Sequence, residues 1–358
     1  MLTIKYPLLQ HIKSAVAERI ARDSHSMSTL MMTDQLRHDL LDILVTYSDK
    51  VPHPASSADS HSNTLIRWQI LAYVASIDLT IAKWFESHLD ALSILFELNY
   101  DKATTGLWAV WAAEGHPLSY QDGKVNGTKA WCSGANSVDY GLLTYRDKHG
   151  QSRLLTVAMQ QEGIEIDNSA WQAVGMQATD TATLQLTQVV ADEIGTPNAY
   201  LDRVGFWHGA AGVAACWYGA TATLAGYLIN AYQQKPNDYK AMYLGQMSMA
   251  LAVTRQYCHH VAKLIDTQPQ LSHELAVRVL RANVEQVARH VLDTVGQALG
   301  AAPFCNHAHF ARLAADLPVF IRQSHGAFDL QKIGELTSES ASHASSHSIA
   351  DQENLWTL

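Results

Sequence analysis

The chain contains few cysteines and no cluster of basic residues. Its four cysteines, Cys132, Cys216, Cys258 and Cys305, are far apart in 358 residues and form no Cys-x-x-Cys pair, so neither a disulfide framework nor a zinc ribbon is expected. The formal net charge is −9, whereas binding to a nucleic-acid backbone needs clustered Lys and Arg. These absences favour reduced thiols and argue against nucleic acid as a partner.

The sequence also lacks the signals of export and of membrane insertion. Residues 1–7 carry no basic segment followed by an apolar stretch and a cleavage site. The longest apolar region, from Phe206 to Leu228, is interrupted by His208, by glycines and by threonines, which is more typical of a buried helix than of a membrane span. We therefore expect a cytoplasmic protein with no membrane association.

The composition is that of a globular protein, and its hydrophobic periodicity changes twice along the chain. Apolar residues make up 47% of the sequence, enough for a large core and two or three domains. Apolar residues at helical spacing predict helices at both ends, while short β-rich runs separated by Gly and Asn turns lie between them. The expected α+β organisation is an N-terminal helical domain (1–105), a middle β domain (106–196), a C-terminal helical domain (197–336) and a flexible Ser- and His-rich tail (337–358).

Two segments of the middle region carry a recognisable pattern. Residues 126–135 read NGTKAWCSGA, and residues 175–184 read GMQATDTATL. Together they resemble the acyl-CoA dehydrogenase family, in which N-G-x-K-x-W-[IV]-[ST] lies on a strand beside the flavin and G-M-x-x-[ST]-D-[ST] follows. The resemblance implies FAD as cofactor, with Trp131 against the flavin ring, Ser133 near its N5 atom and Cys132 between them. A buried strand tryptophan remains the alternative interpretation of Trp131.

The resemblance also implies a fold of N-terminal helices, a middle β-barrel or sandwich and a C-terminal helical bundle. Three family features are altered here. Ala113 and Glu114 match a flavin-contacting strand of the family, but the G-S-D segment that follows it in the family is missing. Residues 232–239 lack the family's diphosphate-binding Arg. The catalytic Glu position falls on His325, or on Ser324 if the alignment is anchored at Asp316.

These features lead to one expected function and two alternatives. The expected function is α,β-dehydrogenation of a small acyl substrate such as an acyl-CoA, by a homodimer or homotetramer with His325 as the candidate catalytic residue. A histidine can act as a general base near neutral pH. The alternatives are a flavin-dependent monooxygenase on the same fold and a degenerate homologue that binds small molecules without redox activity. No metal site is expected, because the clusters at 258–260 and 305–309 show no further ligands.

Overall fold

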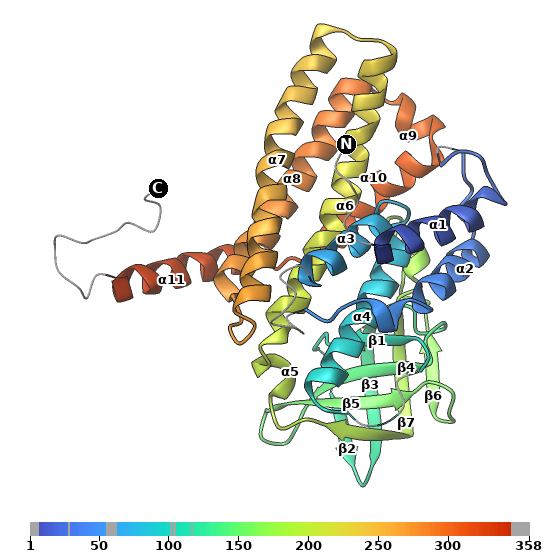
Figure 1. Ribbon diagram of the computed structural model, residues 1–358. Coiled ribbons are helices and arrows are strands. Elements are labelled where there is room, and N and C mark those ends of the chain that lie inside the picture. Colours follow the sequence, from blue (N-terminus) through green and yellow to red (C-terminus); the bar gives the residue numbers. More distant parts are fainter. Residues whose placement is uncertain are drawn as a thin grey trace.

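The computed structural model describes residues 7–27, 29–54, 63–100, 102, 105–115 and 117–344, and it has the order helices, sheet, helices (Figure 1). The N-terminal helices are α1 (Pro7–Ala21), α2 (Asp34–Val45), the short η1 (Ser48–Lys50), α3 (Asn63–Ala75) and α4 (Leu79–Glu97). The strands are β1 (Trp108–Trp111), β2 (Leu118–Gln121), β3 (Lys124–Cys132), β4 (Tyr140–Arg146), β5 (Ser152–Ala158), β6 (Ile164–Asp167) and β7 (Ala182–Ile194), with η2 (Gln177–Thr179) before β7. The C-terminal helices are α5 (Ala199–Asp202), α6 (Gly205–Gln234), α7 (Asp238–Thr267), α8 (Glu274–Leu299), α9 (Ala302–Asn306), α10 (Ala308–Phe320), η3 (Ile321–Gln323) and α11 (Ala327–Ala344).

The strands form one mixed sheet that bends around its own apolar core. The strand order is β1-β4-β5-β7-β3-β2, with β6 also paired to β7. The long strand β7 joins the two halves of the sheet, because its N-terminal part pairs with β3 and β6 while its C-terminal part pairs with β5. Between the halves lies a cluster of buried side chains that includes Trp111, Val125 and Leu155. The expected β domain in the middle of the chain is therefore present.

The long helix α6 runs through the centre of the C-terminal bundle. It is packed against α3, α4 and α8 and buries Trp217, Leu224 and Leu228. Among the described helices α6 alone has the length and hydropathy of a membrane span, and 61% of that stretch is buried inside the protein. Its small residues fit this packing: a Cβ on Gly219 would collide with the backbone of Ala72 in α3. The apolar character of α6 is thus used within the protein.

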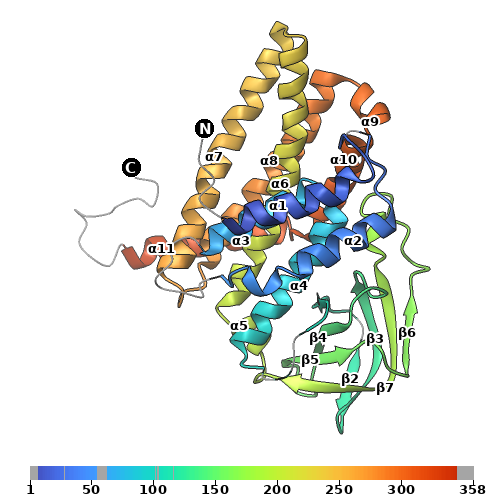
Figure 2. The same ribbon diagram turned by 45° about the vertical axis from the view of Figure 1, so that its right-hand side comes forward.

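The C-terminal segment differs from the sequence expectation. Helix α11 continues to Ala344, so residues 337–344, which the sequence analysis assigns to a flexible tail, are helical; residues 345–358 lie outside the described part. Side-chain contacts one turn apart support the helix, including a bond from Gln331 to Glu335 and an ion pair between Lys332 and Glu335. Both views show α11 starting beside α8 and projecting away from the rest of the protein (Figures 1 and 2).

A buried histidine links three helices of the two helical regions. His309 of α10 lies with Nδ1 2.8 Å from the Tyr227 hydroxyl of α6 and with Nε2 2.9 Å from the carbonyl oxygen of Ser76, just after α3. A neutral ring satisfies both contacts, since it accepts from the hydroxyl and donates to the carbonyl. Burial lowers the pKa of His309 to about 4 from the usual 6.5.

This pKa predicts a loss of stability in acid. The folded-state pKa of His309 lies below the unfolded value, so its contribution is present above pH 6.5 and is lost as the pH falls towards 4. We expect His309→Gln to flatten the fall in unfolding free energy between pH 6.5 and 4, measured by urea denaturation at a series of pH values. The exposed His259 provides the control His259→Gln, and equal pH slopes for the His309 variant and the wild type would contradict the prediction.

Candidate active site

A cavity with apolar and polar walls lies where the sheet meets the helices. It has a volume of about 670 Å³ and is walled by α4, by β1 and the end of β3, by the segment from Trp171 to Thr181, and by the segment from Val319 to His325. Each wall comes from a different part of the chain. The cavity contains both recognised sequence segments and the candidate base position.

Trp131 faces this cavity and is not a core residue. It is the last residue but one of β3 and lies at an irregularity in the pairing with β7. Its backbone is left-handed (φ 64°) and its side chain is 64% exposed. A bulge of this kind redirects a side chain, and a left-handed backbone is unfavourable for a large residue. The edge of Trp171 approaches the Trp131 ring with 6.4 Å between centroids. The alternative interpretation of a buried strand tryptophan is therefore wrong.

Ser133 connects the two recognised segments. Its hydroxyl lies 3.0 Å from the Thr181 hydroxyl, which lies 3.0 Å from that of Thr179. The Thr179 hydroxyl donates to the carbonyl oxygen of Met176. The carbonyl oxygen of Ser133 accepts from the Trp111 indole at 3.1 Å. The hydroxyl groups of Ser133, Thr179 and Thr181 thus form a polar edge of the cavity.

The other residues expected at the cofactor lie in different surroundings. Ala113 lines the cavity. Cys132 points into the core of the sheet, where its thiol donates to the carbonyl of Lys129 and burial raises its pKa to about 12. Glu114 pairs with Arg146 at 2.7 Å at the surface and does not line the cavity. The side chains of Cys132 and Glu114 are therefore not brought to the cavity.

Lys129 stabilises the wall of the cavity through hydrogen bonds to backbone carbonyls, a role that its place in the sequence motif does not predict. Its side chain is 3% exposed, and its ammonium donates to the carbonyl oxygens of Ala113 and Thr144 and to the Thr144 hydroxyl. That hydroxyl donates in turn to the carbonyl of Ala112. Burial lowers the pKa of Lys129 to about 8. This ammonium joins β3 and β4 to the end of β1, where Ala112 and Ala113 line the cavity.

Removal of this ammonium should destabilise the sheet. We expect Lys129→Met to lower the unfolding free energy by about 2–4 kcal/mol, because buried carbonyl acceptors lose their donor. Urea denaturation with tryptophan fluorescence measures the change. Lys124→Met, at the exposed start of the same strand, is the matched control and should stay within about 0.5 kcal/mol of the wild type. Equal losses for both variants would refute the role given to Lys129.

His325 stands at the cavity rim, between η3 and α11. Its side chain is exposed and lines the cavity, and its backbone N–H donates to Asp329 at 3.1 Å. Asp329 is buried and pairs with Arg278 of α8, so this turn is anchored to the bundle. Ser324, the other position considered for the catalytic Glu, accepts a bond from the Gly326 N–H and does not line the cavity. The structure thus brings His325, Trp131 and Ser133 to one cavity.

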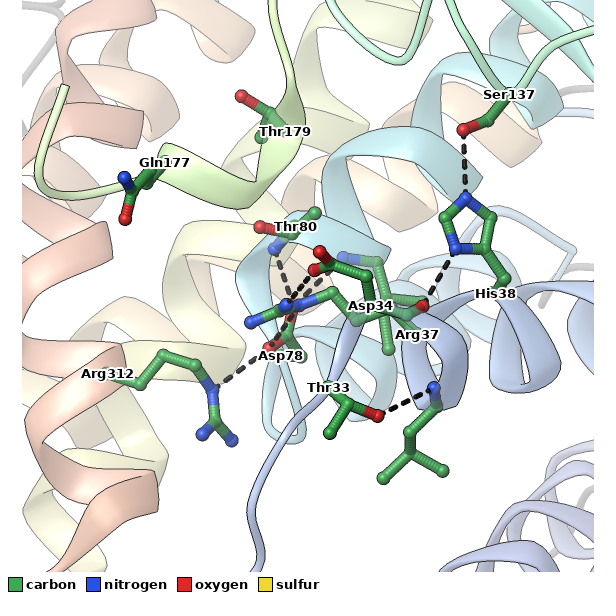
Figure 3. Close-up of polar contacts among 12 residues, drawn as sticks. Thr33, Asp34, Arg37, His38, Asp78, Thr80, Ser137, Gln177, Thr179 and Arg312 are labelled. Atoms are coloured by element: carbon green, nitrogen blue, oxygen red, sulfur yellow. Dashed lines mark hydrogen bonds and ion pairs between the residues drawn. The ribbon is translucent and has the colours of Figure 1, made fainter. Parts of the chain in front are cut away.

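A second polar cavity of about 600 Å³ lies behind the segment that follows Gly175. Asp78, with no exposed surface, caps α4 by accepting from the Thr80 and Ile81 N–H groups, and its carboxylate also pairs with Arg37 of α2 and Arg312 of α10 (Figure 3). Gln177 lines the cavity together with Arg37 and Arg312, and Figure 3 shows its side chain apart from the group around Asp78.

Asp316 of the same helix α10 accepts from the Met176 N–H at 2.6 Å, and burial raises the pKa of that carboxyl to about 6. Gly175 fits closely beside it, because an added Cβ would collide with the carbonyl of Ala315. The charged residues therefore fix helices α2, α4 and α10 against the segment that carries Met176 and Thr179.

The segment that would carry the family's diphosphate-binding Arg lies far from the cavity. Residues 232–239 form the turn between α6 and α7, at the tip of the helical bundle (Figure 1). Lys240 donates there to the carbonyls of Ala231 and Lys235. Within the described part of the chain, no three His, Cys, Asp or Glu side chains converge as they would around a metal ion.

Comparisons with known proteins find a likeness in structure alone. No protein-family model matches the sequence, and no curated protein matches it. The butyryl-CoA dehydrogenase of Megasphaera elsdenii is similar with a TM-score of 0.75 at 14% identity, over 94% of this chain and 99% of that chain. FMN-bound TdsC of Paenibacillus sp. A11-2 is similar with a TM-score of 0.73 at 14% identity, over 94% and 98%.

A third similar structure is KijD3 in complex with FMN and a dTDP-linked amino-keto sugar, with a TM-score of 0.72 at 14% identity over 95% of both chains. The proteins with this architecture thus include a dehydrogenase of acyl-CoA and a protein complexed with a sugar nucleotide. The predicted order of helical domain, β domain and helical bundle is confirmed. The chain has the acyl-CoA dehydrogenase fold.

Proposed function

We propose that this protein is a flavin-dependent oxidoreductase whose flavin ring binds beside Trp131. The observation that carries the proposal is the exposed indole of Trp131, held on a left-handed backbone and facing a cavity. A tryptophan that only filled the core would need neither the exposure nor the unfavourable backbone. Similar structures that contain FMN support a flavin rather than another planar ligand.

The residues present fit a flavin ring. Trp131 and Trp171 offer aromatic surface, and Val319 and Phe320 add apolar surface to the same cavity. The hydroxyls of Ser133, Thr179 and Thr181 lie along one side, where the polar edge of a flavin needs donors and acceptors. A bound flavin would supply the electron transfer itself, while these residues orient it and exclude water.

The phosphate end of the cofactor has fewer obvious contacts. Lys83 and Arg322 are the basic side chains among the described residues that line the cavity, apart from His325. The resemblance implies FAD, whereas FMN carries one phosphate and needs no partner for an adenine. Identification of the bound nucleotide is therefore part of the test.

The test is the visible spectrum of purified protein incubated with FAD or with FMN and then desalted. We expect absorbance at about 450 nm to remain with the wild-type protein after desalting. In Trp131→Ala this absorbance should fall at least tenfold. Chromatography of the released flavin identifies it as FAD or FMN. Met31→Ala, exposed in the loop between α1 and α2, should retain the colour. A wild-type protein that stays colourless with both flavins would overturn the proposal and support the non-redox alternative.

A specific observation favours oxygen activation over dehydrogenation. Among the described residues that line the Trp131 cavity there is no Asp or Glu, and His325 stands at the rim where the sequence comparison places the family's Glu. Removal of an α-proton from a thioester needs a strong, well-placed base, while reaction of reduced flavin with oxygen does not need that carboxylate. We therefore propose monooxygenation as the better-supported reaction, with dehydrogenation as the competing one.

Two assays on flavin-loaded protein separate these reactions. For monooxygenation we expect no bleaching of the flavin by butyryl-CoA without oxygen, and oxygen consumption after chemical reduction. Because a positioned acid or base contributes about 10²–10⁴-fold, His325→Ala should slow oxygen consumption by at least about tenfold, as measured with an oxygen electrode. His149→Ala, in the exposed turn after β4, is the control. Bleaching by butyryl-CoA would instead support dehydrogenation.

A further inference from the structure

The Trp131 cavity continues into a smaller arm, of about 370 Å³, between α4, α6 and α8. Lys83, Ser87 and His325 line both spaces, so a molecule reacting beside Trp131 would extend into the arm. The walls of the arm carry acidic and basic side chains on opposing helices. This charge pattern is unexpected for a space that would hold an unbranched alkyl chain.

The acidic wall is one face of α4. Glu86, Asp90 and Glu97 are spaced four and seven residues apart, which places them on the same side of a helix. Helix α6 accommodates them with glycine, because a Cβ on Gly209 would collide with the Asp90 carboxylate and one on Gly205 with that of Glu97. The packing of the two helices thus leaves room for these carboxylates.

Part of this charge is used within the protein. Glu97 accepts from the backbone N–H of Gly205 at the start of α6 and from the Arg203 guanidinium at 3.1 Å. Arg281 donates to the carbonyls of Ala210 and Gln323 and lies over the ring of Trp217. Glu97 and Arg281 are therefore already bound to structural partners.

Glu86 and Asp90 are not satisfied in the same way. One carboxylate oxygen of Asp90 is fully buried without a hydrogen-bond partner among the described residues, and Arg203 approaches the carboxylate only to 3.8 Å. Glu86 is 6% exposed, pairs with Lys83 at 3.6 Å, and burial raises its pKa. Arg203, itself nearly fully buried, has an Nε donor that is also without a partner. The arm therefore offers one unused buried acceptor on Asp90, a second carboxylate on Glu86, and one unused buried donor on Arg203.

We infer that the arm binds the polar end of a small substrate, one that presents an amino or hydroxyl group to the carboxylates of Asp90 and Glu86. The inference rests on the proposed function, because it concerns the substrate of the same cavity. A donor on the ligand satisfies the buried Asp90 oxygen, which otherwise remains desolvated and unpaired. An alkyl chain would leave this oxygen unpaired and would gain little from a charged wall.

The test compares polar and apolar probes on flavin-loaded protein. The probes are D-glucosamine and methyl glucoside, which carry amino and hydroxyl groups, and hexanoate and butyryl-CoA, which carry alkyl chains. Binding is followed by perturbation of the flavin spectrum and by ligand-induced thermal shift. We expect at least one polar probe to bind more tightly than both alkyl probes, and Asp90→Asn and Glu86→Gln each to weaken it about tenfold or more.

The controls separate binding from structure and this inference from the proposed function. Glu18→Gln, on the exposed side of α1, should change neither affinity nor stability. The inference would be overturned if the protein preferred hexanoate or butyryl-CoA, or if neither polar probe bound. It would also be overturned if Asp90→Asn and Glu86→Gln bound the polar probe with unchanged affinity, even if these variants melt at lower temperature. If the protein stayed colourless but a thermal shift showed that it binds a polar probe through Asp90, the inference would stand and the flavin proposal would be overturned.

Discussion

The buried carboxylate of Asp78 is the contact on which the arrangement of the cavity depends. It caps the first turn of α4 and pairs with an arginine from α2 and another from α10. Buried ion pairs add little net stability, since desolvation opposes their attraction, but breaking one leaves an unpaired buried charge. The main consequence of the Asp78 contacts is therefore to fix α4 in position.

Helix α4 borders every space discussed here. It contributes Lys83 and Ser87 to the Trp131 cavity, Glu86 and Asp90 to the arm, and the Trp84 indole, which donates to the carbonyl of Thr179. Gly134 fits against that indole, because a Cβ there would lie 2.8 Å from the Trp84 Nε1. The position of α4 thus sets the distance between the sheet and the helical bundle.

The sequence predicted one side of the site well and failed on details that depend on a local irregularity of β3. Trp131 and Ser133 reach the cavity, but Cys132 between them points into the core of the sheet, because the irregular pairing between Lys129 and Cys132 breaks the alternation of side chains along the strand. The resemblance places Glu114 at the cofactor because this residue matches the Glu of a flavin-contacting strand in the acyl-CoA dehydrogenase family. Glu114 follows the end of β1, where it is free to pair with Arg146 at the surface.

Local sequence determined the helical and strand segments, the order of the three regions and the two segments that meet at Ser133 and Thr181. These depend on periodicity, turns and short motifs, which act over a few residues. Tertiary structure alone decided that Lys129 would hold the sheet edge through backbone carbonyls, and that Glu86 and Asp90 would line an arm of the cavity. On their own helix these two are ordinary acidic residues. The facing walls of the arm come from residues 200–213 and from Arg281 of α8, more than a hundred residues away in the sequence. Burial against these walls leaves one carboxylate oxygen of Asp90 without a hydrogen-bond partner among the described residues.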